Sequence, residues 1–356
     1  MKRTILMTGG GTAGHVTPNI ALMPQLRVEG WSLHYAGTAD GIERKLIEPI
    51  PDVTYHIITS GKLRRYFSLK NLTDPFRLVK AIFQARKLIK EIKPNVVFSK
   101  GGFVSVPVVI GAIGKAPVVI HESDYSPGLA NRITGHFANT ICVTFEDTLK
   151  FTHKKGIHTG TPIRASLYEG NRQIGLKFAG FTGEKPILLV MGGSQGAQAI
   201  NEAVRAALPE LTEKFDVLHL CGKGKLNDVI DFKGYRQVEY VTDEMPHVFA
   251  AADIIVSRAG ANSVFEFLAL SKPALLIPLP GKTSRGDQIL NASYFERRGY
   301  AITLDQQILS PKSLLQAVFE LYEKRFEIVS AMASEPLADG TDEVLEAIRR
   351  TARDYE

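Results

Sequence analysis

The chain has 356 residues, of which 44% are hydrophobic and 22% are charged. This composition is that of an ordinary globular protein and excludes a disordered or fibrous one, and the length suits two domains better than one core. The net charge of +6 is uneven, because residues 1–160 carry 21 Lys and Arg against 11 Asp and Glu, whereas the remainder carries 22 against 26. The basic half predicts an anionic partner for the first domain.

Strand and helix patterns alternate through the first half. The expected strands are 4–8, 32–36, 54–58, 95–98, 117–121 and 140–144. The expected helices are 18–29, 41–49, 74–92, 104–114 and 127–136. Alternating strands and helices with short loops predict a parallel sheet covered on both faces. In the long helix, apolar residues recur at helical spacing and predict one apolar face, made of Phe76, Val79, Ile82, Phe83 and Ile89.

The second half repeats this pattern after a stretch, 154–185, that lacks periodicity and is interpreted as the linker region. The expected strands are 187–190, 216–220, 237–240, 253–256, 274–277 and 300–303. The expected helices are 197–208, 224–231, 245–251, 261–270 and 286–298. We place the domain boundary at 162/163, with the second domain ending near residue 340.

Each half begins with a strand, a glycine-rich turn and a helix. The glycines are Gly9, Gly10, Gly11 and Gly14 in the first turn and Gly192, Gly193 and Gly196 in the second. Glycines allow a ligand to approach the backbone, and the positive end of the following helix favours phosphate. The sequence therefore predicts two Rossmann-like halves that face each other, with ligands bound at the carboxyl ends of the strands.

The first glycine turn, MTGGGTAGH (7–15), does not have the spacing of a dinucleotide fingerprint, and no acidic residue ends the second strand. The glycines could simply permit a tight turn, and His15 could be a satisfied residue at a helix start. The functional interpretation is a neutral imidazole that accepts a proton from a substrate hydroxyl.

Two polar segments of the second half predict a nucleotide-sugar pocket. In VSRAGANSVFEFLAL (256–270), Glu266 lies among apolar neighbours, where a carboxylate needs donors such as the two hydroxyls of a ribose; the alternative is a solvent-facing helix charge. In PLPGKTSRGDQILN (278–291), polar side chains are expected to face the same cleft: Arg285, Asp287, Gln288 and Asn291.

A basic segment, 60–93, interleaves cations with apolar side chains. Such a pattern is found in nucleic-acid and membrane-binding surfaces, and the alternative for 74–93 is an amphipathic helix docked on its own sheet. For 60–70 we favour an anionic membrane surface and no nucleic acid. The residues expected to touch it are Lys62, Leu63, Arg64, Arg65, Tyr66 and Phe67.

The chain contains no D-x-D carboxylate pair, H-E-x-x-H motif or Cys–His cluster, so we expect no metal and no cofactor. Positive charge for a leaving diphosphate is then expected from helix starts, Arg164 or hydroxyl donors. Cys142 and Cys221 are expected to be buried thiols in a reducing cytoplasm.

Ordered blocks along nearly the whole chain resemble the MurG family of UDP-N-acetylglucosamine:lipid I N-acetylglucosaminyltransferases, in its Gram-positive form. The blocks are GGGTAGH (9–15), SGKLRRY (60–66), SKGGFVSVPVV (99–109), HESDYSPGLAN (121–131), MGGSQGA (191–197), SRAGANSVFEF (257–267) and RGDQILNA (285–292). The resemblance implies a GT-B fold, with the donor UDP-GlcNAc in the second domain. It also implies that a C-terminal helix, about 341–356, packs back on the first domain.

The resemblance assigns residues to the donor. Ser194 and Arg164 would contact its diphosphate, the backbone of Thr242 its uracil, Glu266 its ribose and Gln288 its GlcNAc. The full set of donor residues is Thr12, Ala13, Gly14, Asp124, Arg164, Ser194, Gln195, Thr242, Met245, Ala261, Asn262, Ser263, Val264, Glu266, Asp287 and Gln288. Asp124 and Asp287 stand where many or some relatives carry Asn and Gln.

The acceptor would be lipid I, a MurNAc-pentapeptide linked to undecaprenyl diphosphate. Its diphosphate is expected at the glycine turns, on Gly10, Gly11, Gly101 and Gly102. His15 is the expected base for the MurNAc C4 hydroxyl, with Glu122 as the second candidate. The implied location is the cytoplasmic face of the membrane, with division or cell-wall synthesis proteins as further partners. A diacylglycerol glycosyltransferase, a UDP-GlcNAc epimerase and a UDP-sugar-binding subunit remain as alternatives.

Overall fold

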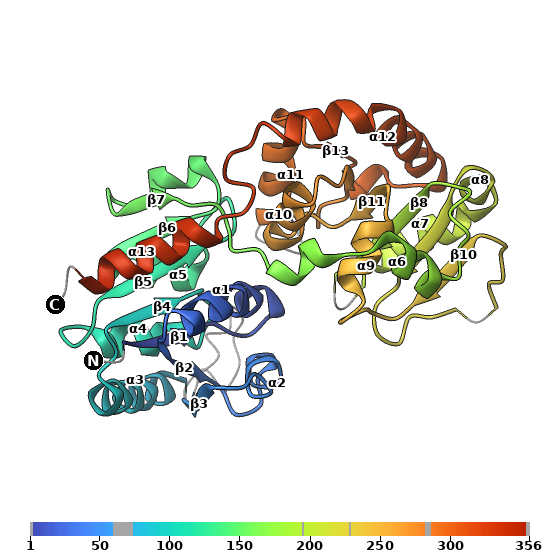
Figure 1. Cartoon of the computed structure of the whole chain (residues 1–356). Coiled ribbons are helices and arrows are strands. Elements are labelled where there is room, and N and C mark those ends of the chain that lie inside the picture. Colours follow the sequence, from blue (N-terminus) through green and yellow to red (C-terminus); the bar gives the residue numbers. More distant parts are fainter. Residues whose placement is uncertain (1–2, 60–73, 194–195, 228, 282–285, 354–356) are drawn as a thin grey trace. The chain divides into compact units, whose positions relative to one another are not determined.

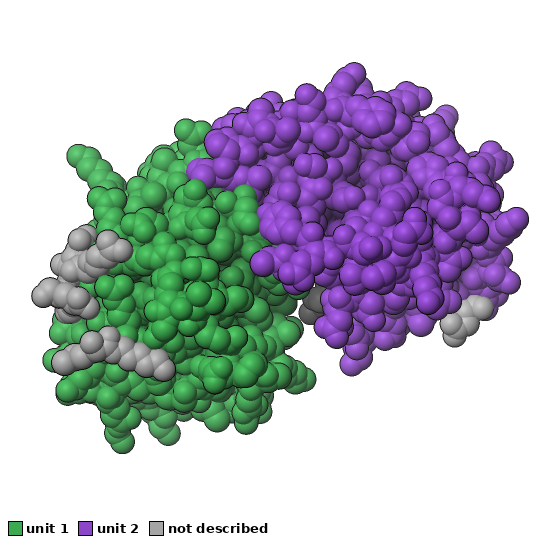
Figure 2. All heavy atoms as spheres, viewed as in Figure 1, with its two compact units in different colours: residues 1–164, 339–356 green, residues 165–338 purple. Residues whose placement is uncertain are grey.

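The structure, a computed structural model, describes residues 3–59, 74–193, 196–227, 229–281 and 286–353. The chain forms two compact units (Figure 2). The first unit contains residues 1–164 and 339–356, and the second contains residues 165–338.

The first unit is built on a seven-stranded parallel sheet with strand order β3-β2-β1-β4-β5-β6-β7. Its strands are β1 (Thr4–Thr8), β2 (Ser32–Gly37), β3 (Val53–Ile57), β4 (Val96–Ser99), β5 (Val118–Glu122), β6 (Thr140–Val143) and β7 (Gly156–His158). Central strands such as β4 are buried along their whole length, because helices cover both faces of the sheet.

The helices of the first unit include one from the far end of the chain. They are η1 (Ala13–His15), α1 (Thr17–Val28), α2 (Ile42–Ile47), α3 (Asp74–Ile92), α4 (Ser105–Ala112), α5 (Leu129–Thr134), η3 (Glu146–Phe151) and α13 (Thr341–Arg353). Val344, Leu345 and Ile348 of α13 are fully buried in the core with Val96 and Val119 of the sheet. The last helix is therefore an integral part of the first unit (Figure 1).

The second unit is built on a six-stranded parallel sheet with strand order β10-β9-β8-β11-β12-β13. Its strands are β8 (Ile187–Met191), β9 (Asp216–Leu220), β10 (Tyr235–Val238), β11 (Ile254–Ser257), β12 (Ala274–Leu276) and β13 (Ala301–Thr303). Its helices are η4 (Ala165–Glu169), α6 (Arg172–Ala179), α7 (Gln198–Ala206), α8 (Leu208–Lys214), α9 (Met245–Ala251), α10 (Ala261–Ala269), α11 (Asp287–Arg297), η5 (Gln306–Ile308) and α12 (Pro311–Met332).

One expected helix of the second half is wrong, and the expected linker region, in which the boundary between the two units lies, contains secondary structure that was not expected. The described residues of 224–231 are turns and loop, fixed by contacts such as the Gln237 amide donating to Asn227 O at 2.6 Å. The expected linker 154–185 contains β7, η4 and α6, because α6 is only eight residues long, too short for its periodicity to stand out. The sequence does offer a start signal for α6, because Asn is a favoured N-cap residue. In the structure, the Asn171 side chain accepts a hydrogen bond from Ile174 N.

The expected apolar face of α3 is wrong in part: Ile89 is buried and Ile82 half-buried, whereas Phe76, Val79 and Phe83 are exposed. The inward face is made of Ala81, Ala85 and other small or aliphatic side chains, and a Cβ added to Gly111 of α4 would lie 3.0 Å from Ala85 Cβ. Small residues thus let α3 and α4 approach closely. Phe76 and Phe83 point outward instead, 79% and 68% exposed.

In the described part of the chain, no helix combines the length and the apolar character needed to cross a membrane.

Candidate active site

The strand order of the first unit changes direction between β1 and β4, and a glycine turn follows each of these strands. The two turns touch through their backbones. A Cβ on Gly102 would lie 2.1 Å from Gly10 O, and one on Gly11 would lie 2.8 Å from the Phe103 ring. Both Gly11 and Gly102 also have positive φ, so glycine is required at these positions. A switch point of this kind is where open parallel sheets bind ligands.

A buried carboxylate holds the first glycine turn in place. Glu43 is fully buried and accepts hydrogen bonds from Gly11 N at 3.2 Å and from the backbone and hydroxyl of Thr38 at 3.1 and 2.6 Å. Gly101 N likewise donates to Ser99 Oγ at 3.3 Å. The N–H groups of Gly11 and Gly101, expected at a diphosphate, therefore have acceptors within the protein.

His15 lies at the end of η1, next to this turn. Its Nδ1 is 3.0 Å from the Thr12 hydroxyl, and its backbone N–H donates to Thr12 O at 3.2 Å. The His15 side chain is half-buried, whereas Thr12 and Gly14 are exposed. An imidazole in this position is oriented by a hydroxyl and remains within reach of a ligand over the turn.

Glu122, at the end of β5, is buried and holds the loop that follows it. Oε1 accepts Asp124 N at 3.0 Å, and Oε2 accepts Gly128 N at 2.9 Å and the Asn131 amide at 3.0 Å. This geometry is that of an anchoring carboxylate. Asp124 is half-buried within the same loop.

Lys100 and His121, to which the sequence analysis assigned no role, are buried beside this loop. The Lys100 Nζ lies 2.5 Å from His121 Nδ1 and also bonds to Ser123 Oγ. Burial lowers the pKa of Lys100 to about 7, against the opposing effect of Glu122 and Asp124. Burial and the nearby Lys100 hold the pKa of His121 well below its ordinary value. The sequence signal that could have pointed to Lys100 is its position at a strand end, directly before two glycines.

The strand order of the second unit changes direction between β8 and β11, and the candidate donor residues of the second glycine turn and of α10 follow these two strands. Gly192 and Gly196 pack closely against neighbouring backbone. A Cβ added to Gly196, for example, would lie 1.9 Å from Cys221 O. Ser194 and Gln195, expected at the donor diphosphate, lie outside the described residues. Next to this turn, α10 begins after Gly260, around which an added Cβ would meet no heavy atom within 4 Å.

The first two turns of α10 present polar groups from a buried helix. Ala261 and Val264 are buried, whereas Asn262, Ser263 and Glu266 are half-buried. Phe265 and Phe267 on either side of Glu266 are buried. The helix start thus combines N–H groups that lack intrahelical acceptors with a partly accessible carboxylate one turn further on.

Two side chains brace the turn before α10. Arg258, which the sequence analysis left without a role, is 9% exposed and donates to Ile277 O at 2.9 Å and Pro278 O at 3.3 Å, and burial lowers its pKa. Asn291 is fully buried and donates to Ala259 O at 3.1 Å, so the expectation that it faces the cleft is wrong.

The remaining donor candidates are spread over other segments. Gln288 is half-buried, and its Oε1 accepts Leu279 N at 3.1 Å. Asp287 begins α11 and is half-buried, and Arg285 lies outside the described residues. Thr242 is exposed in the turn before α9, where its carbonyl accepts the N–H of half-buried Met245 at 3.2 Å. Ala13 is half-buried in η1, and Arg164 is the last residue of the first unit's main segment.

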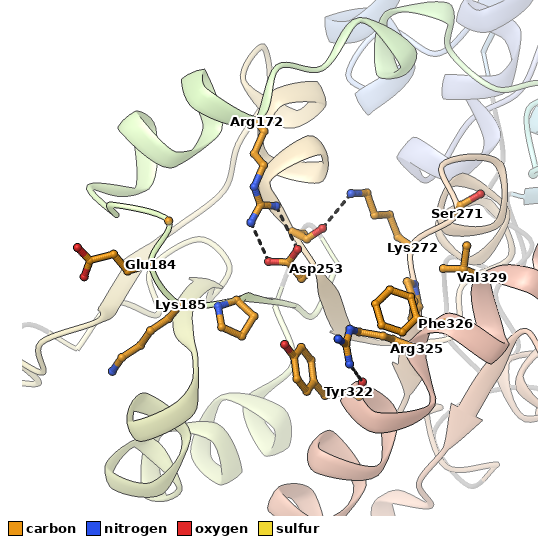
Figure 3. A pocket seen from close by; sticks show the side chains of 14 residues that line it. Arg172, Glu184, Lys185, Asp253, Ser271, Lys272, Tyr322, Arg325, Phe326 and Val329 are labelled. Carbon is orange, nitrogen blue, oxygen red and sulfur yellow. Dashed lines mark hydrogen bonds and ion pairs between the residues drawn. The ribbon is translucent and has the colours of Figure 1, made fainter.

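A separate pocket of about 400 Å³ opens at the opposite end of the second sheet (Figure 3). It is lined by residues directly before β8, β11 and β12 and by α12, whereas the donor candidates at α10 and α11 follow β11 and β12. Its charged groups bond to one another and to the backbone: Arg172 pairs with Asp253 at 3.0 Å, and Lys272 donates to Ala252 O at 2.8 Å. This position separates the pocket from the candidate donor residues.

The residues expected at the membrane, Lys62, Leu63, Arg64, Arg65, Tyr66 and Phe67, lie outside the described residues. Among the residues that the structure describes, no group of three or more His, Cys, Asp and Glu side chains is arranged to hold a metal ion.

Comparisons with known proteins cover both units. Residues 5–143 match the glycosyltransferase family 28 N-terminal domain, and residues 187–346 match the C-terminal domain of that family. A Clostridium tetani protein named UDP-N-acetylglucosamine–N-acetylmuramyl-(pentapeptide) pyrophosphoryl-undecaprenol N-acetylglucosamine transferase is 52% identical over 353 residues, 98% of each chain. A protein of the same name from Lachnoclostridium phytofermentans is 52% identical over 97% of this chain and 98% of its own. The crystal structure of Acinetobacter baumannii MurG has a TM-score of 0.77 and 25% identity, over 98% of this chain and 99% of that one.

Proposed function

The chain belongs to the MurG family of glycosyltransferases, and we propose that its second unit holds the sugar nucleotide and its first unit the lipid-linked acceptor. The enzyme has the GT-B fold and transfers GlcNAc from UDP-GlcNAc to lipid I, which forms lipid II for peptidoglycan synthesis. The observation that carries the proposal is that glycine-containing turns follow the two strands at the switch point of each sheet, β1 and β4 in the first and β8 and β11 in the second.

In the second unit, the start of α10 receives the donor diphosphate. Its N–H groups and positive dipole end favour an anion, and Gly260 leaves space for one. Glu266, one turn later, accepts hydrogen bonds from the ribose hydroxyls, and Gln288 faces the GlcNAc. Arg258 and Asn291 keep the turn in position through their bonds to the backbone.

In the first unit, the acceptor diphosphate lies over the contacting glycine turns. Since the N–H groups of Gly11 and Gly101 are engaged, Gly10 and Gly102 are the candidate backbone donors. Glu122 supports the loop carrying Asp124, and this anchoring role makes His15 the better candidate for the base.

The reaction is an inverting displacement at the anomeric carbon of GlcNAc. The C4 hydroxyl of MurNAc forms the new bond to this carbon, the bond to the UDP oxygen breaks, and UDP leaves with the electron pair. We assign the His15 proton to Nδ1, donating to Thr12 Oγ1, so that Nε2 has the lone pair that accepts the hydroxyl proton.

Outward-facing residues of α3 support attachment to an anionic membrane surface. Phe76, Val79 and Phe83 are exposed on one face of this helix, and the exposed Lys80 and Lys87 lie at spacings that share this face. Exposed aromatic side chains insert at a lipid interface, while lysines attract acidic headgroups. This surface would bring the first unit to its lipid-borne acceptor.

The transfer assay tests the proposal. With a short-chain lipid I analogue and UDP-GlcNAc, the wild-type chain should form a β-1,4-linked disaccharide and release one UDP per transfer. Replacing the acceptor with diacylglycerol, or offering UDP-GlcNAc alone, tests the other glycosyltransferase and the epimerase. Product in either of these reactions without disaccharide formation would contradict the proposal.

A further inference from the structure

A buried lysine lies between the two glycine turns of the first unit, and the reaction described above does not use it. Lys100 follows β4 and is 2% exposed. Its backbone N–H donates to Thr8 O at 2.9 Å, and a Cβ added to Gly9 would lie 3.2 Å from Lys100 Cβ. Lys100 therefore packs against the first turn and directly precedes Gly101 of the second.

The hydrogen-bond partners of the ammonium are neutral groups. Nζ contacts His121 Nδ1 at 2.5 Å and Ser123 Oγ. His121 Nε2 lies 2.9 Å from Gly160 O, and because a carbonyl only accepts, Nε2 carries the ring proton and Nδ1 accepts from Lys100. A lysine buried against an imidazole and a hydroxyl has its hydrogen bonds but lacks the charge compensation of a directly bonded carboxylate.

Glu122, the carboxylate that favours the Lys100 cation most, is bonded to other groups. Glu122 directs its oxygens to the N–H groups of Asp124 and Gly128 and to the Asn131 amide. Glu122, Asp124 and the buried Cys142 of β6 still favour the Lys100 cation, but burial outweighs them and lowers the pKa of Lys100 to about 7. An anion placed over the turns would favour the charged form.

We propose that Lys100 is a positioning residue for the acceptor diphosphate: it supplies the positive charge beneath the glycine turns and holds His121 and Ser123 in place. The inference rests on the proposed placement of the diphosphate at these turns. The Lys100 charge also explains how a diphosphate is attracted to the glycine turns although the N–H groups of Gly11 and Gly101 already donate to acceptors within the protein.

The test measures kcat/KM for a short-chain lipid I analogue between about pH 6 and pH 9, a range in which a diphosphate diester keeps its charge. In the wild type, kcat/KM should fall about tenfold as pH rises past the pKa of Lys100 and the cation is lost. Lys100→Met should have the low value throughout and lack this descending limb. Lys100→Arg should keep the high value and also lack the limb, because guanidinium stays charged. Lys45→Met, on an exposed lysine of α2, should behave as wild type.

The KM for UDP-GlcNAc should stay unchanged in all variants. An unchanged KM means that the lower kcat/KM for the acceptor comes from the lost charge and not from a loss of structure. If Lys100→Met does not fold, the wild-type and Lys100→Arg profiles still decide the matter. Coincident wild-type and Lys100→Arg profiles would overturn the proposal.

An acceptor analogue with an uncharged linker in place of the diphosphate tests the placement of the diphosphate and the role of Lys100 separately. A wild type that uses both analogues equally would contradict the placement of the diphosphate at the turns. A wild type that prefers the diphosphate, together with Lys100→Met that keeps the full preference, would contradict the role of Lys100 alone.

Discussion

His15 is the residue on which the proposed chemistry depends. Replacing it with alanine removes the proton acceptor, so kcat should fall by about 10²–10⁴-fold while the KM values change little. Steady-state transfer to the lipid I analogue measures this effect. His136→Ala, on an exposed histidine of the same unit, is the control. An unchanged kcat in His15→Ala would remove His15 from the role of base.

Glu266 should matter for binding rather than for the chemical step. Glu266→Gln keeps the side-chain size but loses the charge that strengthens two hydrogen bonds to the ribose, and KM for UDP-GlcNAc should rise about 10- to 100-fold. Calorimetric titration with UDP checks the same contact without turnover. Glu210→Gln, on an exposed glutamate of α8, should bind UDP as the wild type does. Full UDP affinity in Glu266→Gln would exclude the ribose contact.

At the residue scale, sequence reasoning found side chains that stand out by type and missed those defined by long-range contacts. Glu266 is conspicuous among apolar neighbours. The bond from Lys100 to His121 joins residues 21 positions apart, and Arg258 reaches carbonyls 19 and 20 positions away. The sequence predicts a binding role for Asn291 because the polarity of this residue is visible in the sequence. Its burial against Ala259 O is not visible there.

At the element scale, α3 offers a membrane test. Phe83→Ser removes an exposed aromatic side chain, and binding to vesicles containing acidic phospholipid should weaken about tenfold in co-sedimentation, with unchanged thermal stability. Phe326→Ser in the second unit is the matched control, since Phe326 is 70% exposed. Equal binding by the Phe83→Ser variant and wild type would contradict the assignment of this face.

The last helix, α13, should be a requirement for folding of the first unit. Ile348→Ala leaves a cavity beside β4 and β5 and should lower the free energy of unfolding by about 2–5 kcal/mol. Urea denaturation followed by circular dichroism measures this change. Ile308→Ala, at a side chain that is 66% exposed, should be close to neutral. A neutral Ile348→Ala would mean that α13 is not part of the core.

Among elements, those with strong periodicity or turn chemistry were predictable. The glycine turns marked the strand ends, and the parallel sheets followed from alternation. The inward face of α3 was predictable from hydrophobicity only in part: Ile89 is buried, but close packing on α4 selects Ala81 and Ala85 and leaves Phe76 and Phe83 outside. The short α6 lacked enough turns to show a period.

For the whole molecule, we propose that two sheets of the same design divide the transfer, with the nucleotide on the second unit and the lipid-linked sugar on the first. The fold class could be predicted from the sequence because each half repeats strand, glycine turn and helix. The strand order could not, since it depends on which strands pair across the sheet. That order is what places the glycine turns after β1 and β4 side by side, and the turn after β8 next to the start of α10 after β11.

Hydrogen exchange of the full chain with and without UDP-GlcNAc tests this division most directly. We expect slower exchange at residues 260–266 and 286–291 of the second unit. Slower exchange confined to the first unit, or to residues 252–253 and 271–273 at the opposite end of the second sheet, would contradict it.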